Sequence, residues 1–292
     1  MTAARAHRTR LVVVFGLTLA VLVVEVVGSW LTNSLALLAD AGHLLTDVVG
    51  IGLALGAMWF AGRPATEART FGYLRLEILA AVVNAVLLLG IAAIIVIEAI
   101  RRLGTPPDIA AGPMLVIAVV GGLANLVGIV LLHAPQRDSL NLRGAYLELV
   151  GDALGSVAVV IAAVVIVATG WTPIDALASI AIGVLILPRT LRLLRDAVDV
   201  LLEATPKGVR MDEIREHILR ARGVADVHDL HAWTITSGLN VVSAHVVMEP
   251  GADPPAVLDE LCRCLSGDFD IEHSTFQLET TDRRRLEDRA HA

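Results

Sequence analysis

The chain has 292 residues, of which 55% are hydrophobic and 18% charged, and its mean hydropathy is +0.71. This apolarity excludes an ordinary soluble domain, and a net charge of −7 without any basic run argues against a nucleic-acid partner. The two cysteines, Cys262 and Cys264, are too few for a disulfide framework and lack C-x-x-C spacing. A membrane protein is therefore expected.

Six apolar runs are each long enough to cross a bilayer, which takes about 20 residues. Turn residues and charges separate them. They span residues 11–31, 35–60, 75–100, 113–133, 142–169 and 174–195. The first run is too long for a secretory signal, lacks a small-residue cleavage site and is followed by further spans. It is therefore predicted to remain as a transmembrane helix.

Arginine placement predicts the orientation of these spans, because cytoplasmic loops are enriched in Lys and Arg. If the N-terminus is cytoplasmic, the outer loops carry only Arg101 and Arg102. The cytoplasmic segments then carry Arg5, Arg8, Arg10, Arg63, Arg69, Arg75, Arg137, Arg143, Arg189, Arg192 and Arg195. Both termini are predicted to be cytoplasmic.

The composition changes after Arg195, which predicts a transmembrane domain at 1–204, a soluble domain at 205–281 and a disordered tail at 282–292. Within the soluble domain, helix and strand patterns alternate around the turn Ser237–Gly238. They cover helix 211–222, strands 224–236 and 239–248, helix 254–265 and strand 273–280. This αββαβ order predicts a small ferredoxin-like α+β sheet with both helices on one face. The fold class is thus a six-helix membrane protein with a cytosolic α+β domain.

Ionisable residues inside the spans are the strongest functional signal, because a charge at membrane depth costs at least about 2.5 kcal/mol. Asp40, His43 and Asp47 lie at i, i+3 and i+7, on one face of the second helix. Glu148 and Asp152 are one turn apart on the fifth. Packing alone does not require such paired groups on two helices, whereas a divalent cation supplies the missing counter-charge.

Four side chains from these two helices therefore form the predicted metal site: His43, Asp47, Glu148 and Asp152. One imidazole and three carboxylates suit four-coordinate zinc. Asp40 is expected to act outside the ligand set, near the ions or on their entry path. For Glu25 in the first span, the same role and simple packing both remain open.

Other polar residues in the spans have simpler explanations. Asn84 and Asn125 fit hydrogen bonds between helices. Glu98 and Asp175 lie near span ends, where a carboxylate can extend to the interface. In the soluble domain, His228 and His231 are three apart in a strand and face opposite sides, so one site cannot use both without a bulge.

Several motifs, in order along residues 10–281, resemble the cation diffusion facilitator family, and more closely its bacterial zinc/cobalt/cadmium branch. They are SLALLADAGH at 34–43 with Asp47 following, RTFGYLRLE at 69–77, DALGS at 152–156, VHDLHAW at 227–233 and SAHV at 243–246. The resemblance implies a homodimer in the bacterial inner membrane that exchanges cytoplasmic zinc, or possibly cadmium or cobalt, for protons. It also implies that zinc has a regulatory role in the cytosolic domain.

The resemblance further assigns residues outside the transport site. It places His228, His245 and His273, with Glu279 possible, at cytosolic metal positions. It makes Arg75 and Glu203 a charge contact between the third and sixth helices at the dimer centre; solvated interface charges are the simpler alternative.

Glu148 departs from the family pattern, in which zinc-type members have histidine at this position. The three carboxylates give the site a charge of −3, and harder ligands are expected to discriminate less against manganese or iron. Protons are expected to compete with the metal for these coupled carboxylates as well as for His43. Three alternatives stay open: a manganese or iron exporter of the same fold, an intramembrane metal-dependent hydrolase, and a membrane-tethered metal sensor.

Overall fold

The computed structural model describes residues 3–134, 140–269, 271 and 273–287. The chain forms two compact units. The first contains residues 1–55 and 81–194, and the second contains residues 56–80 and 195–292. The segment between the second and third long helices thus belongs to the same compact unit as the C-terminal part of the chain.

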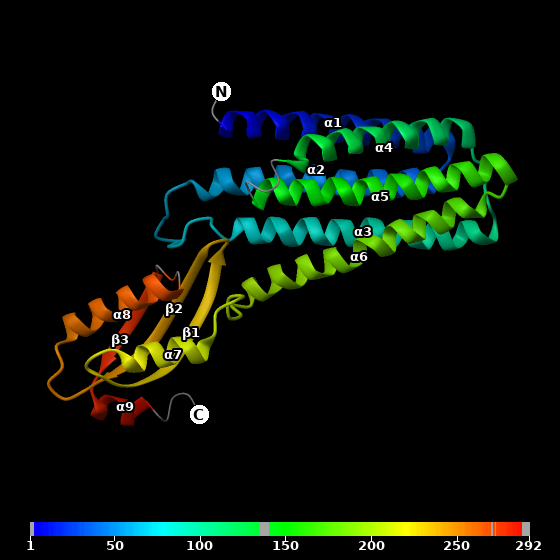
Figure 1. The fold of residues 1–292 in the computed structure, drawn as a ribbon. Coiled ribbons are helices and arrows are strands. Elements are labelled where there is room, and N and C mark those ends of the chain that lie inside the picture. Colours follow the sequence, from blue (N-terminus) through cyan, green and yellow to red (C-terminus); the bar gives the residue numbers. More distant parts are fainter. Residues whose placement is uncertain (1–2, 135–139, 270, 272, 288–292) are drawn as a thin grey trace. The chain divides into compact units, whose positions relative to one another are not determined.

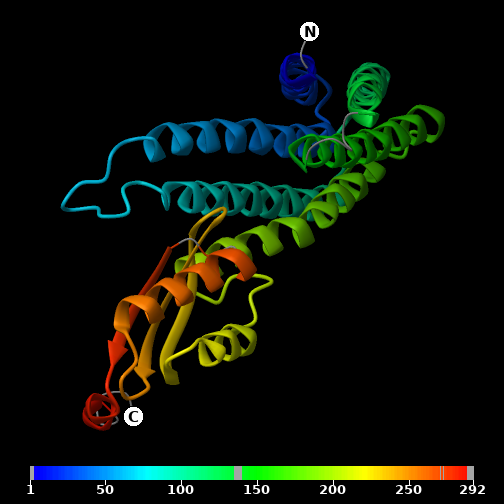
Figure 2. The ribbon, with the colours of Figure 1, turned by 60° about the vertical axis from the view of Figure 1, so that its left-hand side comes forward.

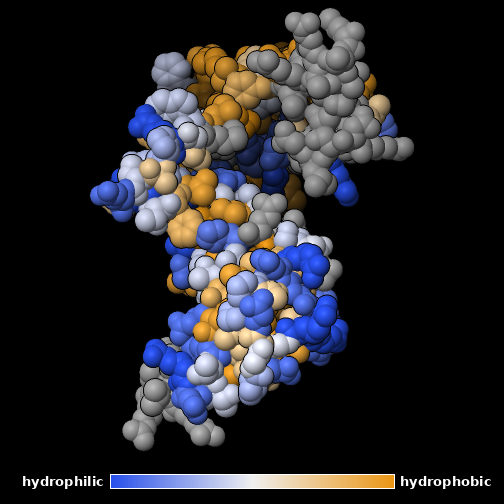
Figure 3. Space-filling model, turned by 90° about the vertical axis from the view of Figure 1, so that its left-hand side faces the viewer, coloured by the Kyte–Doolittle hydropathy of each residue, from blue (hydrophilic) through white to orange (hydrophobic). Residues whose placement is uncertain are grey.

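Six helices have the length and apolar composition needed to cross a membrane, as predicted. Figure 1 shows how they are arranged. They are α1 (Ala3–Thr32), α2 (Leu35–Ala61), α3 (Leu76–Gly104), α4 (Ala111–His133), α5 (Leu140–Thr169) and α6 (Pro173–Leu201). Large apolar side chains cover much of their outer surface, including Trp30, Ile94 and Val130 (Figure 3). Such a surface requires a lipid environment.

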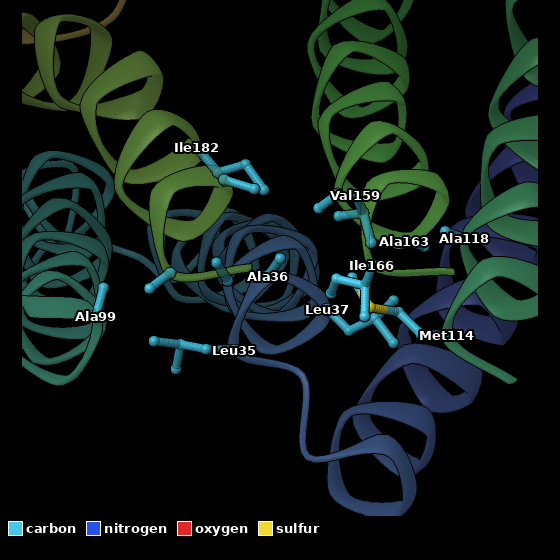
Figure 4. Packing of buried hydrophobic residues seen from close by; sticks show 14 of the residues in the cluster. Leu35, Ala36, Leu37, Ala99, Met114, Ala118, Val159, Ala163, Ile166 and Ile182 are labelled. Carbon is cyan, nitrogen blue, oxygen red and sulfur yellow. The ribbon is translucent and has the colours of Figure 1, made fainter. Parts of the chain in front are cut away.

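The interior of the first unit is built mainly from small and medium-sized residues. Ala36 on α2, Ala99 on α3, Ala118 on α4 and Ala163 on α5 are fully or almost fully buried in one cluster (Figure 4). Small side chains let helix backbones approach closely, which is the main source of packing energy in a bilayer. This close packing fixes the positions from which the polar residues project.

Asp175 is buried rather than extended to the interface, contrary to the expectation from its place near a span end. Its carboxylate accepts hydrogen bonds from the Ser34 hydroxyl (2.6 Å) and from the backbone N–H groups of Leu35 (2.8 Å) and Ala36 (3.2 Å). It therefore caps the N-terminus of α2 from the first turn of α6. A carboxylate is favourable there because free N–H groups and the helix dipole both point at it.

Replacing Asp175 by alanine is expected to lower the free energy of unfolding by about 2 kcal/mol, because buried donors of α2 lose a charged acceptor. The thermal unfolding midpoint of the purified protein in detergent measures this. Glu98→Ala is the matched control, since Glu98 is 39% exposed and pairs with Arg102 (3.2 Å). Equal midpoints for the two variants would contradict the capping role.

The second unit contains the predicted three-stranded sheet with its two helices (Figure 2). Its elements are α7 (Met211–Arg220), β1 (Val224–Thr236), β2 (Leu239–Met248), α8 (Pro254–Phe269), β3 (His273–Glu279) and α9 (Thr281–Glu287). β1 and β2 are antiparallel, and β3 is parallel to β2. Ile218, Leu261 and Val242 share one core, so α7 and α8 cover the same sheet face.

The end of the chain differs from the sequence expectation. Residues 282–287, predicted to be disordered, belong to α9. Asp282 in its first turn is favourable at a helix N-terminus, and Arg284 pairs with Asp226 of β1. The rest of the predicted tail, residues 288–292, lies outside the described residues.

Candidate metal sites

Three of the four predicted transport ligands meet between α2 and α5. His43 Nε2 lies 3.8 Å from Asp47 Oδ2 and 3.5 Å from Asp152 Oδ1. One ligand atom from each lies within 4.8 Å of the other two. The one-turn spacing on α2 places His43 and Asp47 on one face, and Asp152 completes the group from α5. One partly buried acid, Asp47, and one buried acid, Asp152, lie beside an imidazole and form a set of donors that a divalent cation can bridge.

Glu148, the fourth predicted ligand, is not in this group. Its carboxylate accepts a hydrogen bond from the Arg189 guanidinium of α6 at 2.5 Å, and its side chain is 37% exposed. It still borders the same cavity, of about 160 Å³, together with His43, Asp47 and Asp40. The structure therefore places Glu148 at the cavity wall, turned toward an arginine.

A second, smaller cavity, of about 90 Å³, reaches the acids from another direction. Asp47, Glu148 and Asp152 border it, together with apolar side chains of α1 such as Val14 and Phe15. Asp47 and Glu148 border both cavities. The ligand group thus lies between two hollows in the helical unit.

Asp40 borders the same cavity as His43 and is not one of the three residues in the group. The Ser156 hydroxyl donates a hydrogen bond to Asp40 Oδ2 (3.2 Å), and the Asn125 amide donates one to Ser156 (3.3 Å). This chain of contacts joins α2, α5 and α4, so Asn125 forms the predicted contact between helices. Gly155 is required on α5 because an added Cβ would clash with the Asp40 carboxylate.

Glu25 is 1% exposed on α1, and its carboxylate packs against Gly121 of α4. Among the described residues, neither carboxylate oxygen has a hydrogen-bond partner. An unpartnered buried carboxylate is costly, so packing alone does not explain it.

A second ligand group lies on the sheet face opposite α7 and α8. His228 Nε2 lies 3.2 Å from Glu279 Oε2, and His245 Nδ1 lies 3.0 Å from Glu279 Oε1. His228 and His245 are direct partners across β1 and β2, and Glu279 comes from β3. The Glu279 side chain is only 1% exposed and lies between the imidazoles of His228 and His245. In this second group, as in the first, one ligand atom from each residue lies within 4.8 Å of the other two.

His273, predicted to belong to this second group, is not part of it. The register of β2 and β3 pairs His273 with Val241, four residues from His245, whereas Gln277 is the partner of His245. Four residues of strand correspond to about 13 Å. The His273 ring instead lies against Phe71, with ring centroids 5.6 Å apart.

β1 has an irregularity between His228 and His231, which is the condition that strand geometry sets for one site to use both residues. The β1–β2 register shifts between them, and Asp229 has φ +50°. Asp229 Oδ1 lies 3.0 Å from His231 Nε2, and its other oxygen lies 3.8 Å from His245 Nε2. His231 is thus linked to the second group through Asp229, a residue that the sequence did not single out.

The predicted contact between Arg75 and Glu203 is also present, at 2.7 Å. Both residues belong to the second unit, as does Glu77, which accepts hydrogen bonds from the hydroxyls of Thr236 and Ser237 (2.8 Å for Ser237). The start of α3 is therefore joined to the turn between β1 and β2.

Comparison with known proteins places these features in a family. The family described as the cation efflux transmembrane domain matches residues 11–202, and the cation efflux protein cytoplasmic domain matches residues 206–281. This chain belongs to the cation efflux family. It is therefore a multi-pass membrane protein of a transporter family, with the cytoplasmic domain characteristic of that family.

Three relatives show how closely the chain follows the cation efflux family. It is 46% identical to the metal cation efflux system protein CzcD of Cupriavidus metallidurans, over 91% of this chain and 85% of that protein. It is 44% identical to the zinc transporter ZitB of Escherichia coli (92% and 87%). It is 38% identical to the cadmium, cobalt and zinc/H(+)-K(+) antiporter of Bacillus subtilis (94% and 90%). A solved metal-bound C-terminal domain of CzcD matches 24% of this chain at 42% identity, with a TM-score of 0.24.

Proposed function

We propose that this chain is a proton-coupled antiporter that exports divalent cations, chiefly zinc, from the cytoplasm by alternating access. The observation that carries the proposal is the group of His43, Asp47 and Asp152 between two cavities in the membrane helices. Cavities beside the ligands give an ion room to enter, and ligands that bind either protons or a metal suit exchange. Relatives named as zinc, cadmium and cobalt transporters support the metal class.

The remaining expectations belong to the same proposal. His43, Asp47 and Asp152 bind the transported ion, and Glu148 joins them as the fourth ligand. The arginine distribution supports cytoplasmic termini in a bacterial inner membrane. The chain works as a homodimer, with Arg75 and Glu203 near its centre. His228, His245 and Glu279 hold a regulatory metal.

Two other functions are less well supported. A hydrolase would need an open metal position and a general base beside it, whereas every acid at this site is accounted for as a ligand or its neighbour. A manganese or iron exporter is favoured by one observation, the carboxylate-rich composition that Glu148 gives to the site. Vesicles carrying the protein, tested with zinc, cadmium, cobalt, manganese and iron under an imposed pH gradient, distinguish these exporters. If none of the five metals moved under the pH gradient, the antiporter proposal would be wrong.

Glu148→His is expected to raise the ratio of zinc to manganese flux about 10-fold, because imidazole is a softer ligand than carboxylate. The pH dependence of zinc flux is expected to change as well, since one proton-binding carboxylate is replaced. Stopped-flow flux in vesicles at several pH values measures both. An unchanged metal ratio together with an unchanged pH profile would contradict a ligand role for Glu148.

A further inference from the structure

The contact between Arg189 and Glu148 raises a question that the ligand group alone does not. A predicted ligand points at a fixed positive charge of the same protein, 2.5 Å away. Arg189 lies on α6, which contributes no predicted ligand, and it borders the cavity that contains the site. His43 and Asp47 border the same cavity, so Arg189 lies beside part of the ligand group.

The charge balance of the site depends on this arginine. With a neutral His43, the carboxylates of Asp47, Glu148 and Asp152 carry −3, and a divalent cation would leave −1 uncompensated. Arg189 brings the empty site to −2 and the loaded site to zero. Arginine is suitable because its guanidinium stays charged at any physiological pH. A neutral loaded site matters here because uncompensated charge at membrane depth is expensive.

The exposure of the pair decides whether it can open. The Arg189 side chain is 60% exposed and that of Glu148 is 37% exposed. The pair is therefore not enclosed by protein, and an ion that enters the cavity can reach it. Pro188, which precedes Arg189, cannot donate the helical backbone hydrogen bond and loosens α6 at this point. A cation that enters the cavity can therefore take the place of the guanidinium.

We propose that Arg189 is a specificity-determining residue that serves as the counter-charge for Glu148 and yields it to an entering divalent cation. This inference rests on the proposed function of the same site, and it adds a condition on the charge of the cation that the site accepts. Only a cation that offers more than one positive charge gains by replacing the arginine. Glu148 then completes the four ligands as the guanidinium leaves.

A double-mutant cycle tests the proposal on the purified full-length protein, with zinc binding measured by calorimetry. The empty site carries −1 in Glu148→His, −3 in Arg189→Gln and −2 in the double variant. Zinc is expected to bind about 10-fold more tightly to Arg189→Gln than to the wild type, because Glu148 is then free to bind it. The double variant is expected to bind zinc within about twofold of Glu148→His, because no Glu148 is left there for Arg189 to occupy. Arg189→Lys keeps the charge and is expected to bind within about twofold of the wild type.

The matched control is Arg192→Gln, an exposed arginine one turn further along α6, which is expected to leave zinc binding unchanged. An equal gain in zinc affinity on removing Arg189 from the wild type and from Glu148→His would overturn the proposal, as would equal effects of Arg189→Gln and Arg192→Gln. The second comparison does not use Glu148→His, so it can be read even if that variant folds poorly. Absence of zinc flux by the wild type would instead overturn the antiporter while leaving the binding cycle valid.

Discussion

Asp152→Asn is expected to reduce zinc flux on the order of 100-fold or more, the largest effect of any single change considered for this chain. The substitution keeps the size of the side chain but removes the one carboxylate that α5 contributes to the ligand group. Metal ligands must be deprotonated and charged to compete for zinc, and an amide is a much poorer ligand. Flux into vesicles under a pH gradient, with zinc affinity measured in parallel, gives the result.

The matched control for Asp152 is Asp199→Asn on α6. The Asp199 side chain is 45% exposed and makes a long contact with Arg195 (3.9 Å). Zinc flux by Asp199→Asn is therefore expected to stay within about twofold of the wild type. If Asp152→Asn transported zinc as fast as this control, the ligand group would not be the transport site. Function without Asp152 would favour the membrane-tethered sensor, in which the soluble domain does the work.

The second large effect is expected at Glu279, where two imidazoles meet one buried carboxylate. If this group binds zinc, then zinc at about 100 times its Kd stabilises the sheet by about 2.7 kcal/mol. Backbone amides of β3 that exchange by opening of the sheet then exchange about 100-fold more slowly. Glu279→Gln is expected to abolish most of this protection, because it removes the ligand shared by His228 and His245.

Hydrogen exchange of the full-length protein, with and without zinc, measures this effect. Glu249→Gln is the control, since Glu249 is an exposed acid just after β2. Zinc-dependent protection of β3 that persists in Glu279→Gln would show that the metal binds elsewhere in the domain. Protection that is absent from the wild type would show that the group is a hydrogen-bonded cluster without a metal.

Much of the architecture could be predicted because it depends on local sequence patterns. Hydropathy over about 20 residues is sufficient to locate a span, and all six spans were found. The pairing of His43 with Asp47 follows from helical spacing alone, and placing Asp152 beside them needed only the assumption that two charged helix faces meet. The αββαβ order followed from turn residues and periodicity in the same way.

The errors arose where position depends on contacts distant in sequence. Asp175 lies 141 residues from Ser34, and Arg189 lies 41 residues from Glu148, so no local pattern reveals either contact. The error at His273 in the second ligand group has the same cause, because strand register also depends on contacts distant in sequence. A sequence shows that β3 exists but not that Gln277, rather than His273, is opposite His245. The only local signal at Arg189 was its charge near a span end, which orientation rules already explained.

The cap that Asp175 provides has a mechanical consequence. It fastens one end of α6 to the start of α2, while Arg189 lies fourteen residues further along α6, about 21 Å from this fulcrum. A tilt of α6 by about 10° around the fulcrum would move the guanidinium by about 4 Å, more than enough to part it from Glu148. The Asp175 contact would thus hold the N-terminal end of α6 in place while a tilt of the helix moves Arg189.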